Sequence, residues 1–214
     1  MRPYASHVNL LPHFVDCSVF YPGSKIPEGI QGSSITVGYI GRLVESKGVR
    51  LMVEVLPALP ENCRLQFVGK GSLRDELERQ AKELGVASRV SFQPPVPYAM
   101  VPDRLRSMDT LVLPSQESQF WIEQFGRVLI EAMACGVPVV ASQSGEIPRT
   151  LGPGGMLVPP GDRRALSEAL LALVTNPTLR AETGAAGRSR ALENYDAPIV
   201  AASFIQAIQS LRLS

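Results

Sequence analysis

EQFGRVLIEAMACGVPVV, residues 123–140, combines a helical pattern of apolar residues with a β-branched run that follows it directly. The spacing of the apolar residues predicts a helix from Gly126 to Ala134 and a strand from Val137 to Ala141. A helix that leads into a buried strand is the repeating unit of a parallel sheet covered by helices. This stretch therefore predicts an α/β fold.

The same alternation of strand and helix extends in both directions from this stretch. Further β-rich runs predict strands at Ile35–Ile40, Arg64–Val68, Val90–Phe92, Thr110–Leu113 and Met156–Val158. Helices are predicted at Gly48–Leu56 and from a capping box at Ser72–Asp75 to Leu84, with Gly85 ending the second helix. Together these elements predict a Rossmann-like, three-layer α/β/α domain with a parallel sheet.

Three segments of the chain differ in pattern. Residues 1–34 carry prolines and glycines between short apolar pieces, which predicts an extended connector with little core of its own. Residues 35–175 contain the predicted Rossmann-like domain. Residues 176–214 are predicted to be helical, with breaks near Asn176 and Asp196.

The composition argues against several classes of protein. Lysine and arginine (21) nearly balance aspartate and glutamate (20), so no overall positive field would attract nucleic acid. The three cysteines are far apart and lack metal-binding spacing, which predicts buried free thiols. No apolar run approaches the roughly 20 residues of a spanning helix, and the first residues do not resemble a signal peptide. We expect a cytoplasmic protein.

Glycines and charged residues follow the predicted strands at their carboxyl ends, where open parallel sheets bind ligands. Arg42 and Lys47 flank the turn after the first strand, and two cations beside a helix N-terminus suit a phosphate or diphosphate. The run of residues 69–72 lacks the earlier glycine of a P-loop, and GxGxxG is missing after the first strand. We expect Gly69 and Gly71 to let the backbone approach a ligand closely.

Two glutamates in the opening stretch have residue types and positions that suit a sugar nucleotide. Glu131 lies inside an otherwise apolar helix, where a carboxylate needs a partner. A carboxylate can accept hydrogen bonds from two hydroxyl groups, so Glu131 suits the vicinal diol of a ribose. Glu123 lies nearer the expected ligand, where it could meet a sugar or a developing positive charge. The alternative is that Glu131 is an ordinary residue of the helix surface.

This segment resembles the GT-B glycosyltransferases of the large retaining family 4, the glycosyl transferases group 1. The pair Glu123–Glu131 matches the family's E-x7-E motif, and residues 131–142 are close to its consensus. Residues 38–43 with Lys47-Gly48 are similar to its phosphate-contacting segment, and residues 155–162 to its late strand and turn. The resemblance implies the C-terminal, donor-binding half of a GT-B fold.

The resemblance also implies roles for particular residues. Arg42 and Lys47 would contact the diphosphate and Glu131 the ribose, while Glu123, with the two cations, would be catalytic. The implied donor site comprises Gly41, Arg42, Lys47, Gly69, Val96, Phe125, Gly126, Arg127, Val128 and Glu131. Fixed cations and helix amides would stabilise the charge on the leaving diphosphate. No DxD motif occurs, so neither a metal nor another cofactor is expected.

The implied reaction is transfer of a hexose, with retention, from a nucleotide sugar to a glycan or lipid-linked acceptor. The expected donor is a UDP-sugar, with a GDP- or ADP-sugar as alternatives. The family's N-terminal domain is not in this chain, so we expect the chain alone to be inactive and its last helices to cross back to that domain. The full-length protein could lie peripherally at the inner face of the membrane.

Two features depart from the family pattern. Arg149 stands where the family often has an acidic residue, and residues 93–96 lack a glycine that is common there. Other readings stay open: an epimerase-like relative of the same fold, a non-catalytic module that binds a nucleotide sugar, and a structural domain. Without a partner domain, Phe120, Trp121 and the final helix are expected to expose apolar surface.

Overall fold

The computed structural model describes residues 11–23, 34–119 and 121–212, which contain one six-stranded sheet. The strands are β1 (Ile35–Ile40), β2 (Cys63–Val68), β3 (Val90–Gln93), β4 (Thr110–Leu113), β5 (Val139–Ser142) and β6 (Met156–Val158). All neighbouring strands are parallel, in the order β3-β2-β1-β4-β5-β6. The order reverses between β1 and β4, which is where open α/β sheets place a ligand crevice.

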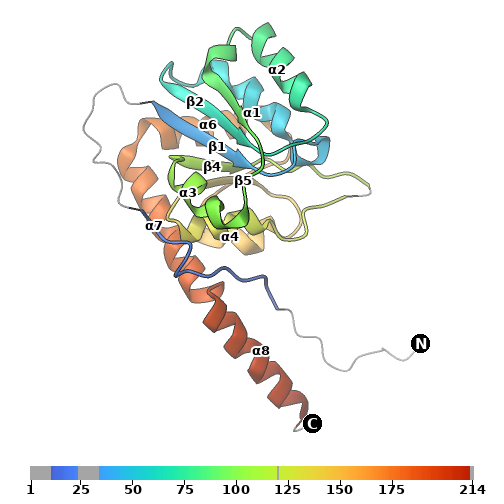
Figure 1. The fold of residues 1–214 in the computed structure, drawn as a ribbon, viewed down its shortest axis with the longest axis vertical. Coiled ribbons are helices and arrows are strands. Elements are labelled where there is room, and N and C mark those ends of the chain that lie inside the picture. Colours follow the sequence, from blue (N-terminus) through green and yellow to red (C-terminus); the bar gives the residue numbers. More distant parts are fainter. Residues whose placement is uncertain (1–10, 24–33, 120, 213–214) are drawn as a thin grey trace.

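Helices flank this sheet (Figure 1). They are α1 (Val49–Val55), α2 (Arg74–Glu83), α3 (Val101–Arg106), α4 (Arg127–Ala134), α5 (Ile147–Leu151), α6 (Arg163–Thr175), α7 (Pro177–Asn194) and α8 (Ala197–Arg212). Helix α1 packs against α2 and α6, while α4 packs against α3, α5 and α7. The predicted Rossmann-like α/β architecture with a parallel sheet is confirmed.

Most predicted strands are found within a residue of their predicted bounds, but β5 begins two residues later than expected. The Val137 N–H donates to the Ala132 carbonyl at 3.0 Å, so Val137 closes the end of α4. Pro138 has no N–H to offer a sheet. Helices α3 and α5 were not predicted, because each is too short to display a helical repeat of apolar residues.

Helix α2 begins without the predicted capping box. Leu73, not Ser72, is its N-cap residue, and it makes no side-chain cap hydrogen bond. Leu73 is buried, and its N–H donates to the Leu43 carbonyl at 3.0 Å. The start of α2 is therefore set by docking on the loop after β1, which leaves no local signal. Gly85 follows the helix with φ +69°, as its predicted role at the C-terminal end requires.

The described part of the predicted connector, residues 11–23, adds side chains to the core of the sheet domain. Val15, Cys17 and Phe20 are buried in the main hydrophobic cluster. The other predicted connector residues before Ser34, at 1–10 and 24–33, lie outside the described residues. All three cysteines are buried free thiols, as predicted.

The same segment is fastened to the far end of the chain. The Val15 N–H donates to the Tyr195 carbonyl at 2.8 Å, and the Ala197 N–H donates to the Val15 carbonyl at 3.0 Å. Arg188 on α7 donates to the Phe20 carbonyl at 2.8 Å and to a carbonyl at the end of α4 at 2.5 Å. The connector and the junction of α7 with α8 therefore lie side by side (Figure 1).

Helix α8 extends away from the sheet (Figure 1). Among the side chains of α8 that the structure describes, the large apolar ones at Ile199, Phe204, Ile205 and Ile208 are exposed, which confirms the predicted apolar surface of the final helix. Trp121, predicted to be exposed, is half-buried, and Phe120 lies outside the described residues. Among the residues that the structure describes, no helix combines the length and the apolar character needed to cross a membrane.

Candidate functional site

The loop after β1 carries the two cations Arg42 and Lys47. The Tyr39 hydroxyl donates to the Arg42 carbonyl at 2.7 Å, and the Leu43 N–H donates to the Lys70 carbonyl at 2.9 Å. A short 3₁₀ helix, η1 (Glu45–Lys47), follows in this loop and was not predicted. Because its backbone is tied to the sheet edge, the loop holds both cations at the carboxyl end of β1.

Gly69, which follows β2, touches the loop after β1. A Cβ atom at Gly69 would lie 1.9 Å from the Gly41 carbonyl oxygen, and one at Gly71 would lie 2.1 Å from the Leu43 carbonyl oxygen. Gly69 also has φ +153°, which favours glycine. The glycines were predicted to admit a ligand, but the close contacts they permit are between the two loops. Contact between Gly69 and a ligand stays a prediction.

Glu123 meets Lys47 at this edge. The Lys47 ammonium lies 2.5 Å from the Glu123 carboxylate, which also accepts a hydrogen bond from the Ser115 hydroxyl at 2.8 Å. The ring centroid of Trp121 lies 4.8 Å from the same ammonium. Glu123 is only 7% exposed, so these two donors satisfy a charge that burial would otherwise penalise.

The long loop between β4 and α4 carries Glu123 and is held on two sides. The Gln116 N–H donates to the Ser46 carbonyl at 2.9 Å, and the Glu146 N–H donates to the Glu123 carbonyl at 3.0 Å. A Cβ atom at Gly145, where φ is +51°, would lie 2.0 Å from the Glu123 carbonyl oxygen. The Glu123 backbone is therefore fixed between the loops after β1 and β5.

An apolar cavity of about 290 Å³ lies beside Arg42. Its lining consists of Ile40, Gly41, Arg42, Val68, Gly69, Lys70, Pro95, Val96 and Val101. Four predicted site residues, from the loops after β1, β2 and β3, meet in this cavity. Beneath the loop, burial and then the Glu123 charge raise the pKa of the Tyr39 phenol, whereas Arg42 lowers it. Arg42 and Glu123 thus shift the pKa of the same Tyr39 phenol in opposite directions.

Glu131 is a buried residue of α4, 7% exposed, so the alternative of an ordinary surface residue is wrong. Its carboxylate lies 3.4 Å from the Arg127 guanidinium. Burial raises the pKa of Glu131, while Arg127 and a hydrogen-bonding contact with Tyr98 act in the opposite direction. An ionised carboxylate has about four acceptor positions, so Glu131 has room for further donors.

Helix α4 begins at the glycine predicted to start it. Gly126 is the N-cap residue with φ +76°, and a Cβ atom there would lie 2.9 Å from the Leu129 side chain. Arg127 is exposed and Val128 is half-buried in the first turn. Because glycine has no side chain to cap the helix, the first N–H groups of α4 can interact with an anion.

Phe125 lines a second cavity, of about 460 Å³, which none of Arg42, Lys47 and Glu123 lines. The ring centroid of Phe125 lies 4.8 Å from the His13 ring centroid and 6.0 Å from the Tyr195 ring centroid. The lining consists of Leu11, Pro12, His13, Gln124, Phe125, Glu146, Arg149, Thr150, Arg190, Asn194 and Tyr195. Arg149, which departs from the family pattern, is thus part of this wall, 3.6 Å from the Glu146 carboxylate.

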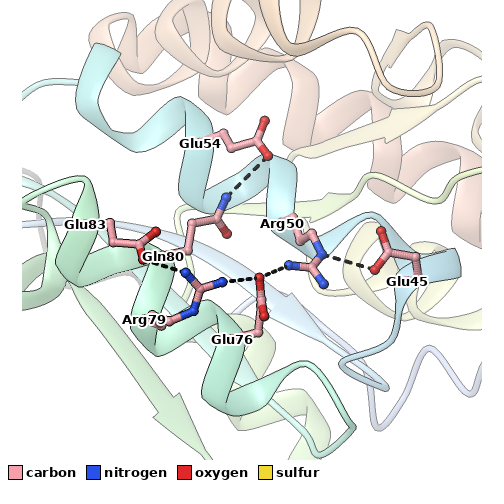
Figure 2. Close-up of polar contacts among 7 residues, drawn as sticks. All are labelled: Glu45, Arg50, Glu54, Glu76, Arg79, Gln80 and Glu83. Carbon is pink, nitrogen blue, oxygen red and sulfur yellow. Dashed lines mark hydrogen bonds and ion pairs between the residues drawn. The ribbon is translucent and has the colours of Figure 1, made fainter.

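A chain of ion pairs joins η1, α1 and α2 (Figure 2). Arg50 contacts Glu45 at 3.1 Å and Glu76 at 2.5 Å. Arg79 extends the chain, at 2.7 Å from Glu76 and 2.5 Å from Glu83. Because Glu45 lies between the two site cations in the sequence, this network fastens their loop to α2.

The predicted site residues therefore form four local groups along one sheet edge: Lys47 with Glu123, the lining of the smaller cavity, Arg127 with Glu131, and Phe125 in the larger cavity. Two residues beside the site were not predicted: Ser115, whose hydroxyl donates to Glu123, and Tyr98, whose ring lies 5.4 Å from the Arg127 guanidinium. Each of these two residues follows the carboxyl end of a predicted strand, and that position in the sequence could have indicated that they belong to the site.

Comparison with known proteins places the chain among sugar-transferring enzymes. Residues 24–190 match the family described as glycosyl transferases group 1. A GDP-mannose-dependent alpha-(1-6)-phosphatidylinositol monomannoside mannosyltransferase of Mycolicibacterium smegmatis is 35% identical in an alignment of 197 residues that covers 86% of this chain and 52% of that protein. The chain spans about half the length of the curated relatives it matches.

Two solved structures share the fold. Sucrose-phosphate synthase from Thermosynechococcus elongatus has a TM-score of 0.82 at 28% identity, over 98% of this chain and 54% of that one. The C-terminal domain of a glycosyl transferase group 1 family protein from Francisella tularensis has a TM-score of 0.72 at 24% identity, over 86% of this chain and 99% of that one. The second likeness concerns the fold alone.

Proposed function

The chain belongs to the glycosyl transferases group 1 family, and from that premise we propose that it binds the nucleoside diphosphate sugar that serves as hexose donor. The observation that carries the proposal is the meeting of Lys47 with Glu123 at the sheet edge where Arg42 also lies. Two cations beside the uncapped first turn of α4 suit a diphosphate. The diphosphate would lie between Arg42, Lys47 and that turn.

The nucleoside would lie next to the diphosphate. The smaller cavity has an almost wholly apolar lining, which suits a heteroaromatic base against Val96. Glu131 would accept hydrogen bonds from the ribose diol. UDP is the nucleotide expected from the sequence, and the name of the mannosyltransferase relative makes GDP an equally important probe.

Transfer breaks the bond between the anomeric carbon and the diphosphate oxygen. Negative charge then grows on the diphosphate, and removing one well-placed donor to such a charge typically costs about 3 kcal/mol of barrier. Arg42 and Lys47 would supply this stabilisation. When Lys47 turns to the phosphate, the Glu123 carboxylate is left to face the positive charge that grows on the sugar.

The complete reaction is proposed for the whole protein, because the curated relatives are about twice as long as this chain. We propose transfer with retention to a glycan or lipid-linked acceptor, with a second domain completing the site and this chain alone inactive. The exposed apolar side chains of α8 would pack against that domain. A lipid acceptor, as in the name of the mannosyltransferase relative, would bring the whole protein to the inner membrane face.

The family match favours sugar transfer over the epimerase-like alternative. A non-catalytic module that binds a nucleotide sugar is the remaining alternative, and it predicts the same nucleotide binding without transfer. Joining this chain to the acceptor-binding half of a relative and assaying hexose transfer distinguishes the two. Transfer that Glu123→Gln abolishes would support catalysis.

The binding proposal is tested by calorimetric titration of the chain with UDP, GDP and ADP, each with and without magnesium. We expect saturable binding of one nucleotide, weakened about tenfold or more by Arg42→Ala and by Glu131→Ala. Arg163→Ala, an exposed arginine of α6, is the matched control. Binding of none of the three nucleotides, or binding that neither site substitution weakens, would overturn the proposal.

A further inference from the structure

The larger cavity adjoins the edge that carries Glu123. Gln124 and Phe125, which directly follow Glu123 in the chain, form part of its wall. Glu146, another wall residue, donates its N–H to the Glu123 carbonyl at 3.0 Å. A ligand in this volume of about 460 Å³ would therefore lie beside the proposed diphosphate site and not within it.

Arg190 of α7 is fixed in the wall of this cavity. Its Nε–H group donates to the Thr150 carbonyl at 2.9 Å, and one Nη group donates to the Arg149 carbonyl at 2.5 Å. A Cβ atom at Gly152 would lie 2.6 Å from the guanidinium carbon, so the backbone there packs directly against it. The Tyr195 ring centroid lies 5.7 Å away. These contacts hold the guanidinium in one orientation before any ligand arrives.

The positive charge of Arg190 is not neutralised within the part of the chain that the structure describes, where no carboxylate lies within ion-pair distance of it. Its two short hydrogen bonds use two of the five N–H donors of a guanidinium, so donors remain for a ligand. Arg149, on the same wall, has a side chain that is 63% exposed and lies 3.6 Å from the Glu146 carboxylate. Among the described lining residues, two arginines stand against this one carboxylate, so the cavity carries a net positive charge.

The remaining wall suits a hydroxylated ring. The Phe125 ring centroid lies 4.8 Å from that of His13 and 6.0 Å from that of Tyr195, and the ring planes meet at 67° and 84°. Aromatic surface next to a few polar groups is characteristic of sites for small organic ligands. Gln124 and Asn194 add side-chain amides, which both donate and accept hydrogen bonds and therefore suit hydroxyl groups.

We propose that this cavity is a second ligand site, which takes a sugar or polyol that carries a phosphate or carboxylate group. Arg190 and Arg149 would hold the anionic group, since a guanidinium can donate two parallel hydrogen bonds to such oxygens. The position beside Glu123 makes this ligand the acceptor, a role that rests on the proposed function. Binding of the anionic sugar itself does not require a nucleotide.

The test follows the amide NMR signals of the isotope-labelled full chain during titration with glucose 6-phosphate, glucuronate and glucose. We expect saturable shifts at residues 146–152 and 190–195 with one or both anionic ligands, and binding of glucose at least about tenfold weaker. Arg149→Ala should weaken binding of the anionic ligands about fivefold or more, because it removes a cation and leaves the Glu146 carboxylate to repel them. The preference between glucose 6-phosphate and glucuronate identifies the anionic group.

A second variant, Arg190→Lys, keeps the positive charge but not the planar fork, and should weaken binding of the anionic ligands about threefold or more. Arg164→Ala is the matched control, because Arg164 is also an exposed arginine that pairs with a glutamate of its own helix, at 2.7 Å. Arg42→Ala is measured in parallel, since the proposed diphosphate site also attracts phosphate. Neither Arg164→Ala nor Arg42→Ala should change the affinity that the cavity residues report.

Three outcomes would overturn the site: glucose that binds as tightly as the anionic ligands, binding of those ligands that Arg42→Ala weakens and Arg149→Ala does not, and absence of binding. If the anionic sugars bind as expected but no nucleotide does, the site stands, and the proposed function falls together with the acceptor role. If a nucleotide binds and none of the sugars does, the proposed function stands and this inference falls.

Discussion

Lys47 and Glu123 neutralise one another across 76 residues of sequence, at 2.5 Å between ammonium and carboxylate. Their side chains are only 15% and 9% exposed. A diphosphate bound beside Arg42 would compete with Glu123 for the Lys47 charge. Binding of the diphosphate to Lys47 would then break the ion pair and release the Glu123 carboxylate.

Glu123→Gln should therefore bind a nucleoside diphosphate more tightly than the wild-type chain, and sugar transfer should be lost when the variant is joined to the acceptor-binding half of a relative. The substitution removes the negative charge that holds Lys47, and we expect the dissociation constant to fall by roughly threefold to tenfold. Calorimetry with GDP and UDP measures the change. Glu146→Gln, which alters an exposed neighbouring carboxylate, is the control. Weaker binding by Glu123→Gln would mean that the carboxylate itself helps to hold the nucleotide.

Glu131→Gln should stabilise the ligand-free chain and weaken nucleotide binding. Burial raises the pKa of Glu131 above its unfolded value, so between those two pKa values the folded chain binds more protons than the unfolded chain. Stability contributed by this group is therefore lost as pH rises through that window and regained as pH falls. The glutamine removes this dependence and should raise the Tm at pH 7 by a few degrees, the shift that about 1 kcal/mol produces at this length.

Thermal unfolding of both proteins from pH 4 to pH 8 checks this prediction, with nucleotide affinity measured in parallel. Binding by wild type should weaken as pH falls, because the protonated carboxyl group accepts fewer hydrogen bonds from the diol. A Tm that drops in Glu131→Gln at neutral pH would show that the carboxylate has stronger partners than Arg127 and Tyr98.

Gly69→Ala should destabilise the fold far more than Gly85→Ala. A Cβ atom at Gly69 would lie 1.9 Å from the Gly41 carbonyl oxygen, whereas at Gly85 no atom lies within 4 Å of the added carbon. Both glycines have positive φ, +153° at Gly69 and +69° at Gly85, so alanine strains the backbone at either position, but only at Gly69 does its Cβ atom also clash. Urea unfolding should give a loss of more than about 2 kcal/mol for Gly69→Ala. Equal losses would show that the two loops can move apart without cost.

The ion-pair chain of Figure 2 should contribute little to global stability but should affect the loop that carries the cations. Arg50→Ala is expected to lower the Tm by less than about 2 °C at low salt, and by less still in 1 M salt. Hydrogen exchange should nevertheless speed up at the amides of residues 44–48. Arg164→Ala, which breaks an exposed pair on α6, is the control and should leave those amides unchanged. Unaltered exchange in Arg50→Ala would remove the network's role in fixing the loop.

The strands were predictable because their signal is local. The bounds of β1, β4 and β6 follow from short apolar runs that end in glycine, proline or a polar residue. The start of α2 was not predictable, because Leu73 is fixed by a hydrogen bond to Leu43, thirty residues away in sequence. The buried connector residues Val15 and Phe20 were missed for the same reason, since their partners lie on α7 and beyond.

The candidate site followed from chain position and from motif resemblance, but its contacts did not. Arg42, Lys47 and Glu123 were expected at one edge because parallel strands end together. The pairing of Lys47 with Glu123 and the contact of Tyr98 with Arg127 depend on side-chain packing between loops. No spacing or periodicity in the sequence indicates such pairings between loops.

The pairing of Val15 with Tyr195 and Ala197 joins an early segment of the described chain to the junction of its last two helices. The segment that enters the domain and the helix that leaves it pass through one point, held by two backbone hydrogen bonds. Residues 11–23 and the start of α8 therefore form one joint unit, and separating them from each other would break both backbone hydrogen bonds together.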